Sequence, residues 1–168
     1  MSEILLNNMT EKLKGQFGDA IYSASLEREF PVFTVKKELL KEILHFLRDN
    51  PECSFRFLTT ACGIHYPESK GSEFAMMYQL HNLQKNWRIR LMSFASAKET
   101  KFPSICNLFP SANWMEREAY DFFGIEFEGH PDLRKILNME EQDYFPLRKE
   151  YPLEDATRED KNDTMFGR

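Results

Sequence analysis

The sequence has few of the cysteines that mark metal clusters and disulfide frameworks. Its 168 residues include only three, Cys53, Cys62 and Cys106, and no two of them form a C-x-x-C pair. Three scattered thiols cannot supply the four ligands of an ordinary iron–sulfur cluster. An odd number of widely spaced cysteines also argues against a disulfide framework and agrees with a reducing compartment. We therefore expect this chain to hold no cluster.

Glycine is equally scarce, at seven residues. Neither G-x-G-x-x-G nor G-x-x-x-x-G-K-[ST] occurs, and few loops can bring their backbone close to a phosphate. The chain is therefore not expected to bind a nucleotide by itself.

Long apolar runs are also missing, since none approaches the roughly 20 residues that cross a bilayer. The N-terminal stretch carries charges throughout, which does not fit the layout of a signal peptide. It is typical of an amphipathic helix, with Leu5, Met9, Leu13 and Phe17 near one face. We therefore expect a cytoplasmic protein that associates with a membrane only through partners.

Positive charge is in deficit, because the chain has a net charge of −5. Residues 1–110 hold 14 Lys and Arg against 12 Asp and Glu, whereas residues 111–168 hold 8 against 15. A nucleic-acid binder would show a basic stripe, so that class is disfavoured. The acidic C-terminal third favours either attraction to a basic partner surface or a tail that only increases solubility.

Hydrophobic periodicity predicts an α+β domain. The clearest helix spans residues 36–49, where Leu39, Leu40, Ile43, Leu44 and Leu47 form an apolar stripe. Strands are expected at 19–30, at 32–35, at 54–60 with Phe55 and Phe57 on one face, at 73–82 and at 87–91.

The order of these elements predicts the domain organisation. The last two strands should form an antiparallel hairpin, and Pro31 favours an edge position for the strand that it begins. Residues 62–72 and 96–110 are expected to be connectors. The whole predicts a mixed or antiparallel sheet with helices packed on one face, over residues 1–123. A long extended C-terminal tail, residues 124–168, should follow and become ordered on a partner.

Residues 111–152 carry the most informative pattern in the chain. Residues 112–123 predict a helix with one apolar face, made by Ala112, Met115, Ala119 and Phe122. Asn113 and Glu116 have the spacing of a capping box, and Gly124 fits the left-handed residue that ends a helix. A second face combines Trp114 with charged residues, and an indole among charges favours a protein interface. An Arg117–Asp121 surface ion pair is the alternative interpretation.

Beyond Gly124 the chain loses regular periodicity, while Pro131, Pro146 and Pro152 each remove a backbone donor. Eleven apolar residues nevertheless follow, far more than a disordered spacer needs: Ile125, Phe127, Leu133, Ile136, Leu137, Met139, Tyr144, Phe145, Leu147, Tyr151 and Leu153. A segment that has anchors but no core of its own must dock on another surface.

Four motifs in this region resemble one family. They are W-M-E-R-E-x-x-D from Trp114, G-I at Gly124, H-P-D-L-R from His130 and P-L-R-K from Pro146. Together with the strand-rich middle and the closing run 158–163, they resemble the 30-kilodalton subunit of respiratory complex I, the NADH–quinone oxidoreductase. Two positions depart from the family pattern. Lys135 stands where a second Arg is frequent, and Tyr144 stands where a Gly usually precedes the aromatic residue, which leaves the local turn geometry open.

The resemblance implies a non-catalytic structural subunit of the peripheral arm of a proton-pumping complex. The parent complex carries FMN and iron–sulfur clusters and uses NADH and quinone, whereas this chain should hold no cofactor. The implied partners are other complex I subunits, chiefly the quinone-site subunit related to hydrogenase large subunits, on the cytoplasmic face of the bacterial inner membrane. The candidate partner-binding residues are Trp114, Glu116, Arg117, Glu118, Asp121, His130, Asp132, Arg134, Leu147, Arg148 and Lys149.

Two other interpretations stay open at this point. The chain could be the equivalent subunit of a membrane-bound hydrogenase-type complex. It could also be a small metal-dependent enzyme that uses Glu116, Glu118, Asp121 and His130, although no H-E-x-x-H or E-x-x-H motif supports this. A metal shared by His65 and His81 is a variant of the second interpretation.

Overall fold

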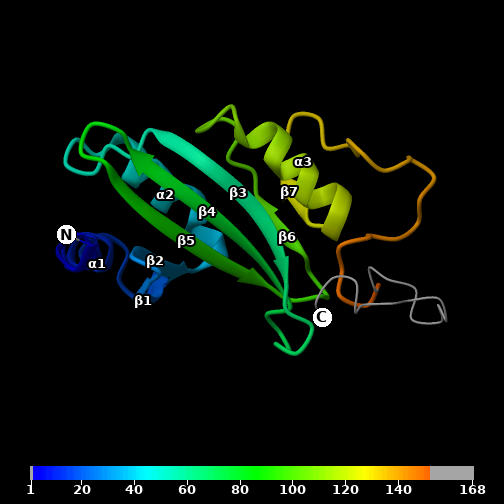
Figure 1. Ribbon diagram of the computed structural model, residues 1–168, viewed down its shortest axis with the longest axis horizontal. Coiled ribbons are helices and arrows are strands. Elements are labelled where there is room, and N and C mark those ends of the chain that lie inside the picture. Colours follow the sequence, from blue (N-terminus) through cyan, green and yellow to red (C-terminus); the bar gives the residue numbers. More distant parts are fainter. Residues whose placement is uncertain (1, 152–168) are drawn as a thin grey trace, which may run out of the picture.

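The computed structural model describes residues 2–151, which form one core of helices and strands (Figure 1). The helices are α1 (Ser2–Phe17), α2 (Leu40–Asp49) and α3 (Ala112–Phe123), with short 3₁₀ turns η1 (Gly18–Ala20) and η2 (Lys37–Leu39). The strands are β1 (Ile21–Glu27), β2 (Phe30–Val35), β3 (Phe57–His65), β4 (Phe74–Asn82), β5 (Trp87–Ala95), β6 (Lys101–Pro103) and β7 (Glu126–Glu128).

The main sheet has five strands in the order β1-β2-β5-β4-β3. β2 pairs with β5 in parallel, and the other neighbours are antiparallel. The β4–β5 hairpin runs the full length of both strands, and Phe74, Met76, Tyr78 and Leu80 are buried on its inner face as their alternation predicts. The predicted α+β class with a mixed sheet is therefore confirmed.

Two predictions about the first strands are wrong. The strand expected over 19–30 ends at Glu27, because Arg28 and Glu29 adopt positive φ values of 46° and 71° and turn the chain into β2. β2 is not an edge strand, since β1 and β5 flank it. Pro31 is tolerated there because it pairs only with Leu26 of β1 and lies outside the segment that pairs with β5.

The strand expected over 54–60 lies further along the chain, at Phe57–His65, and takes in part of the predicted loop. Phe55 is fully buried before the strand begins, whereas Phe57 is 48% exposed, so the two do not share a face. The Arg56 N–H donates back to the Ser54 carbonyl at 3.0 Å, and this tight turn at Phe55 breaks the alternation that the sequence suggested. Gly63 then allows α3 to approach, because a Cβ at this position would lie 2.9 Å from the Phe123 ring.

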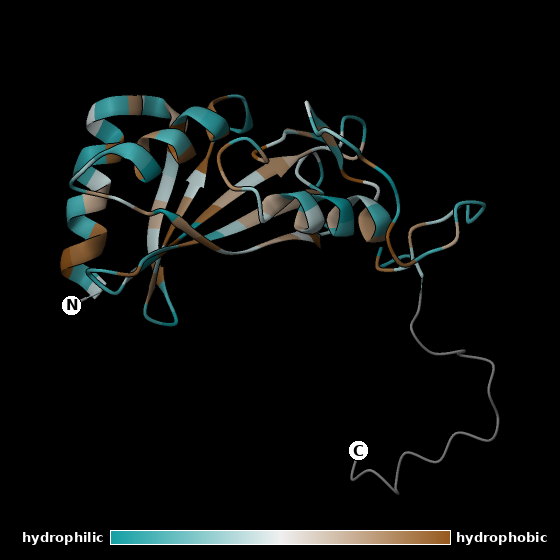
Figure 2. Ribbon diagram, turned by 90° about the horizontal axis from the view of Figure 1, so that it is seen from above, coloured by the Kyte–Doolittle hydropathy of each residue, from teal (hydrophilic) through white to brown (hydrophobic). Residues whose placement is uncertain are grey.

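The first two helices pack on one side of the sheet. Leu40, Ile43, Leu44 and Leu47 of α2 are fully buried, which confirms most of the predicted stripe. α1 contributes Leu5, Met9 and Leu13 to the same core. Figure 1 shows α2 behind the sheet, and Figure 2 shows α1 and α2 together at one end with α3 further along the molecule. The helix α3 therefore occupies a separate position, against β3.

A small second sheet joins the predicted connector to the chain after α3. β6 lies inside the predicted 96–110 connector and pairs in parallel with β7, so that Phe102 lies beside Phe127. Ile125 and Phe127 are buried in the main core. The core therefore continues beyond Phe123, and the division of the chain into 1–123 and 124–168 stays a prediction.

Within residues 2–151, none of the helices combines the length and the apolar character that crossing a membrane requires. Residues 130–151 contain turns and bends and follow the outside of α3 (Figure 1). The remaining part of the predicted tail, with Leu153 and the run 158–163, lies outside the described residues. An extended tail therefore also stays a prediction.

Candidate interface around helix α3

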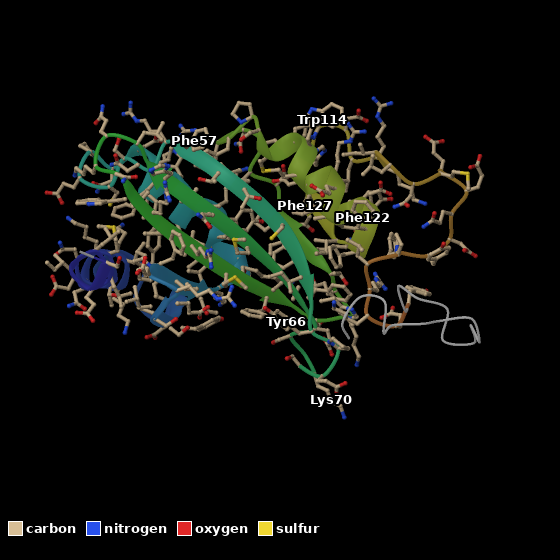
Figure 3. The ribbon with its side chains drawn as sticks, viewed as in Figure 1. Phe57, Tyr66, Lys70, Trp114, Phe122 and Phe127 are labelled. Atoms are coloured by element: carbon tan, nitrogen blue, oxygen red, sulfur yellow. The ribbon has the colours of Figure 1, made fainter. Side chains whose placement is uncertain are left out.

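Helix α3 begins after Ser111 and ends at Gly124, as the sequence predicts, but its first turn lacks the predicted capping box. No side chain caps the helix at Ser111, and the Glu116 carboxylate is turned into the protein instead of back toward Asn113. Gly124 has a φ of 70° and its N–H donates to the Tyr120 carbonyl at 2.8 Å, which confirms the left-handed helix end. Trp114 points away from the body and is 62% exposed (Figure 3).

Glu116 joins α3 to the loop that follows β6. Its carboxylate is fully buried and accepts hydrogen bonds from the Ser104 hydroxyl at 2.7 Å and the Ile105 N–H at 2.8 Å. The Cys106 thiol is a third donor, at 3.3 Å. Burial raises the pKa of Glu116, and the three donors limit this rise. The residue is therefore a structural anchor inside the domain.

His130 closes the turn after β7 onto the start of α3. Its Nδ1 accepts the Asp132 N–H at 3.0 Å, so the proton of the neutral ring is on Nε2. Nε2 lies 3.1 Å from the Asn113 carbonyl and donates to it, and it is 4.0 Å from Glu116. His130 therefore shapes the turn that it belongs to.

Cys106, Glu116 and His130 bring potential metal-ligand atoms within 4.8 Å of one another. Each group already has a hydrogen-bond partner, and burial raises the pKa of Cys106 to about 11, so its thiol stays protonated. A metal would have to displace these bonds and remove the thiol proton. The alternative site shared by His65 and His81 is excluded, because they lie at opposite ends of the β3–β4 pair.

Asp121 binds the backbone of the chain that passes over α3. Its Oδ2 accepts the N–H groups of Ile136 at 3.1 Å, Leu137 at 2.8 Å and Asn138 at 3.1 Å. Its Oδ1 accepts the Asn138 side-chain amide at 3.0 Å. Burial opposes ionisation, but these bonds together lower the pKa of Asp121. Three successive N–H groups directed at one carboxylate fix the shape of residues 136–138.

Arg117 binds the residues that come just before 136–138 in the same segment. Its guanidinium donates from Nε to the Arg134 carbonyl at 3.1 Å and from Nη2 to the Lys135 carbonyl at 3.2 Å, and it lies 4.8 Å from the Trp114 ring centre. Arg117 and Asp121 are both buried. The alternative of a solvated Arg117–Asp121 ion pair is therefore wrong, because each side chain binds the backbone of residues 134–138 instead.

The two departures from the family pattern have different consequences. The Lys135 ammonium donates to the Met139, Glu140 and Gln142 carbonyls, which uses its three N–H groups in a way that a flat guanidinium would not. Tyr144 does not adopt a positive φ, so its replacement of a glycine causes no backbone strain of that kind. Lys135 therefore closes the loop 135–142 on itself.

Arg148 fastens the far end of the segment to the end of α3. Its Nε donates to the Phe123 carbonyl at 2.8 Å, and its guanidinium lies over the Phe145 and Phe74 rings at 4.6 Å and 5.0 Å. The adjacent Lys149 N–H donates to Nδ1 of His65 at 3.0 Å. His65, expected in a loop, is in fact buried at the end of β3 and stacked on Phe74.

The structure divides the predicted interface residues into two groups. Four are fixed within the chain by the contacts above: Glu116, Arg117, Asp121 and Arg148. His130 is half-buried and also bound internally. The remainder are exposed and belong to α3 or to the segment that crosses it: Trp114, Glu118, Asp132, Arg134, Leu147 and Lys149. Asp132 and Arg134 pair with each other at 2.9 Å.

Sequence reasoning missed the residues that complete this network. Ser104, Cys106, Lys135 and Asn138 contribute contacts, and none of them lies in a periodic pattern. The spacing P-D-L-R-K-x-x-N, which places an amide shortly after the basic pair, is the one local signal that could have indicated Asn138. The fold and this site define a domain that wraps its own C-terminal segment around one helix and presents apolar side chains beside it.

Several solved structures share this fold, including these two. One is Nqo5, as its trypsin-resistant fragment (1-134), which is 28% identical with a TM-score of 0.64, over 79% of this chain and all of that chain. The other is a chain of the membrane-bound sulfane sulfur reductase, an archaeal respiratory membrane complex, with a TM-score of 0.70 over 88% of this chain and 85% of that one. The second is only 19% identical, so it shows the fold alone.

Sequence comparison gives the family. Residues 33–157 match the model of the respiratory-chain NADH dehydrogenase 30 Kd subunit. An NADH-quinone oxidoreductase subunit from Trichlorobacter lovleyi is 38% identical over 153 residues, 91% of this chain and 93% of that protein. The subunit of the same name from Hyphomonas neptunium is 36% identical over 148 residues, 88% of this chain and 72% of that protein. The chain belongs to the 30 Kd subunit family of respiratory-chain NADH dehydrogenase, and the resemblance inferred from the four motifs is confirmed.

Proposed function

We propose that the chain is a non-catalytic structural subunit of the peripheral arm of a proton-pumping NADH–quinone oxidoreductase. In this role it docks on the quinone-site subunit through its C-terminal segment, on the cytoplasmic face of the membrane. FMN, the iron–sulfur clusters, NADH and quinone belong to other subunits, and this chain contributes scaffold. The relatives named above are subunits of an NADH-quinone oxidoreductase, which supports the assembly role.

One observation carries the docking proposal. Buried charged groups of α3 bind the backbone of residues 134–138, and the Leu137 side chain of this segment is left exposed. Exposed large hydrophobic residues gather here, at Trp114, Leu137, Met139, Tyr144, Leu147 and Tyr151. Clustered aromatic and aliphatic side chains of this kind mark protein interfaces.

The protease behaviour of a relative supports the same division between body and tail. The solved Nqo5 chain is a trypsin-resistant fragment, and all of it matches 79% of this chain. We expect trypsin to leave the β-sheet body of the free chain intact and to cut first in the C-terminal segment, because cleavage requires locally unfolded, exposed backbone.

A truncation tests the proposed function. Deleting residues 130–168 keeps Ile125 and Phe127, which the core needs, but removes the docking segment. In cells that lack the native chain, the truncated protein should accumulate in folded form, while assembled complex and membrane NADH–quinone activity are lost. Normal assembly of the truncated chain would contradict the docking proposal.

The absence of a cofactor has its own test. The purified chain should be colourless and should not oxidise NADH, because it lacks cluster-ligand and nucleotide motifs. Stoichiometric iron or zinc would favour the metal-dependent alternative. The proteins that co-purify with a tagged copy from native membranes would separate the NADH–quinone oxidoreductase from a hydrogenase-type complex.

A further inference from the structure

We propose that residues 136–139 form a preformed apolar plug, with Leu137 and Met139 as its two anchors, that inserts into an apolar pocket of the quinone-site subunit. This inference rests on the proposed function, because it concerns the same docking segment. It adds three points: the residues that enter the partner, the chemistry of the pocket, and the hydrogen bonds that fix the shape of the plug before assembly.

The two anchors are the most exposed large apolar side chains of the described residues. Leu137 and Met139 are each 72% exposed, although they lie in a segment whose backbone is bound to the buried Asp121. In Figure 1 the segment arches away from α3 and returns beneath its end. Two exposed aliphatic side chains on a fixed turn can serve as anchors that fill a pocket on a partner.

Three side chains fix the turn: Arg117 and Asp121 from α3, and Lys135 from the segment itself. Asp121 binds three consecutive N–H groups of the plug, and Arg117 binds the carbonyls just before it. The Lys135 ammonium donates to the carbonyl of Met139, the last residue of the plug, and to that of Glu140, which follows it. A turn with this many internal bonds is already ordered before binding. Binding therefore does not cost the conformational entropy of ordering it. Residues 136–138 are therefore expected to be ordered before assembly.

The residues after the plug define the rim of the pocket. Glu140, Glu141 and Asp143 are exposed and follow the anchors directly. Carboxylates at the edge of an apolar contact are matched by basic side chains on the partner, which fix orientation and exclude wrong partners. The occupied site is therefore an apolar pocket with a basic rim, and the flexible Met139 side chain can adapt to its shape.

The first experiment tests the anchors. In cells that lack the native chain, the double variant Leu137→Ser/Met139→Ser should lower assembled complex about thirtyfold, the effect of losing one hot spot. The matched control is Ile4→Ser/Leu83→Ser, which removes side chains that are 67% and 64% exposed on other parts of the surface. Both proteins should unfold at the wild-type temperature, because the substituted side chains lie outside the core.

The outcomes are distinct. If the anchor variant assembles normally while the 130–168 truncation fails to assemble, the plug is wrong and the proposed function stands. If the anchor variant and the truncated chain both assemble normally, the plug and the proposed function are both wrong. If the purified wild-type chain is a dimer that the anchor variant converts to a monomer, the plug binds a second copy of this chain, and the proposed pocket is overturned.

The second experiment tests whether the turn is preformed. In the isolated full-length chain, the amide protons of residues 136–138 should exchange slowly, and Asp121→Ala should remove this protection while the amides of β4 are unchanged. Glu42→Ala, which removes an exposed carboxylate from α2, is the control. Rapid exchange of residues 136–138 in the wild-type chain would overturn the preformed plug.

Discussion

At the scale of single residues, the charged positions of α3 have roles that a helical wheel cannot assign. The sequence places Arg117 and Asp121 on a polar face and Glu116 on another, but it does not say what covers either face. The structure covers both: the loop after β6 binds Glu116, and residues 134–138 bind the other two. The residue types and their spacing were therefore informative, while their partners depended on chain segments that have no periodicity.

The raised pKa of Glu116 predicts how the stability of the fold depends on pH. Burial raises its folded-state pKa above the ordinary value of 4.5, so the folded state holds the proton more tightly than the unfolded chain does. This carboxyl therefore lowers the free energy of unfolding as pH rises from its unfolded pKa through its folded pKa. Glu116→Gln cannot lose a proton, so the wild type should lose stability relative to this variant across that range and not above it.

Chemical denaturation of both proteins at several pH values checks this prediction. Their difference in unfolding free energy isolates Glu116 from carboxyls with lowered pKa values such as Asp121, which titrate in both proteins. A difference that stays constant from acid to neutral pH would contradict a raised pKa for this group.

At the scale of elements, long periodic segments were predictable and short paired ones were not. The stripe of α2 and the alternation of β4 and β5 identified their buried faces because each repeats over several turns or residues. β6 and β7 have only three residues each and exist because they pair with each other across the intervening α3, so no local pattern predicts them. β3 was misplaced because a tight turn at Phe55, closed by the hydrogen bond from the Arg56 N–H to the Ser54 carbonyl, comes before the strand begins at Phe57.

The close packing at Gly124 predicts that a side chain at this position would disturb the attachment of the C-terminal segment to α3. A Cβ at this position would lie 2.5 Å from the Phe145 ring and 2.7 Å from the Arg148 guanidinium, on a backbone with a φ of 70°. Gly124→Ala should therefore displace residues 145–148 and cost about 1–2 kcal/mol for the left-handed conformation alone. Gly15→Ala, where a Cβ meets no atom within 4 Å, is the control.

Two measurements check the glycine prediction. Denaturation should show the lower unfolding free energy in Gly124→Ala, and limited trypsin digestion should cut after Arg148 and Lys149 faster than in the wild type. Unchanged stability together with an unchanged digestion rate would show that the segment does not press on the end of α3.

At the scale of the whole molecule, the chain separates stability from recognition. The sheet and its helices enclose one continuous core, from Leu5 in α1 to Phe127 in β7. Most of the acidic C-terminal segment that the structure describes lies outside this core, and it uses backbone hydrogen bonds to hold exposed apolar side chains in place. The predicted attraction to a basic partner surface fits this arrangement, because apolar anchors and flanking carboxylates lie on the same segment.

The central claim is that residues 130–151 lie on the quinone-site subunit in the assembled complex. The most direct test is to place a photo-reactive amino acid at position 139 in the functional complex, irradiate it in native membranes and identify the cross-linked protein by mass spectrometry. Position 4 of α1, which is exposed but far from the segment, gives the control. The account predicts cross-links from position 139 to the quinone-site subunit and none to it from position 4. Cross-links from position 139 to other subunits alone, in a complex that retains NADH–quinone activity, would contradict it.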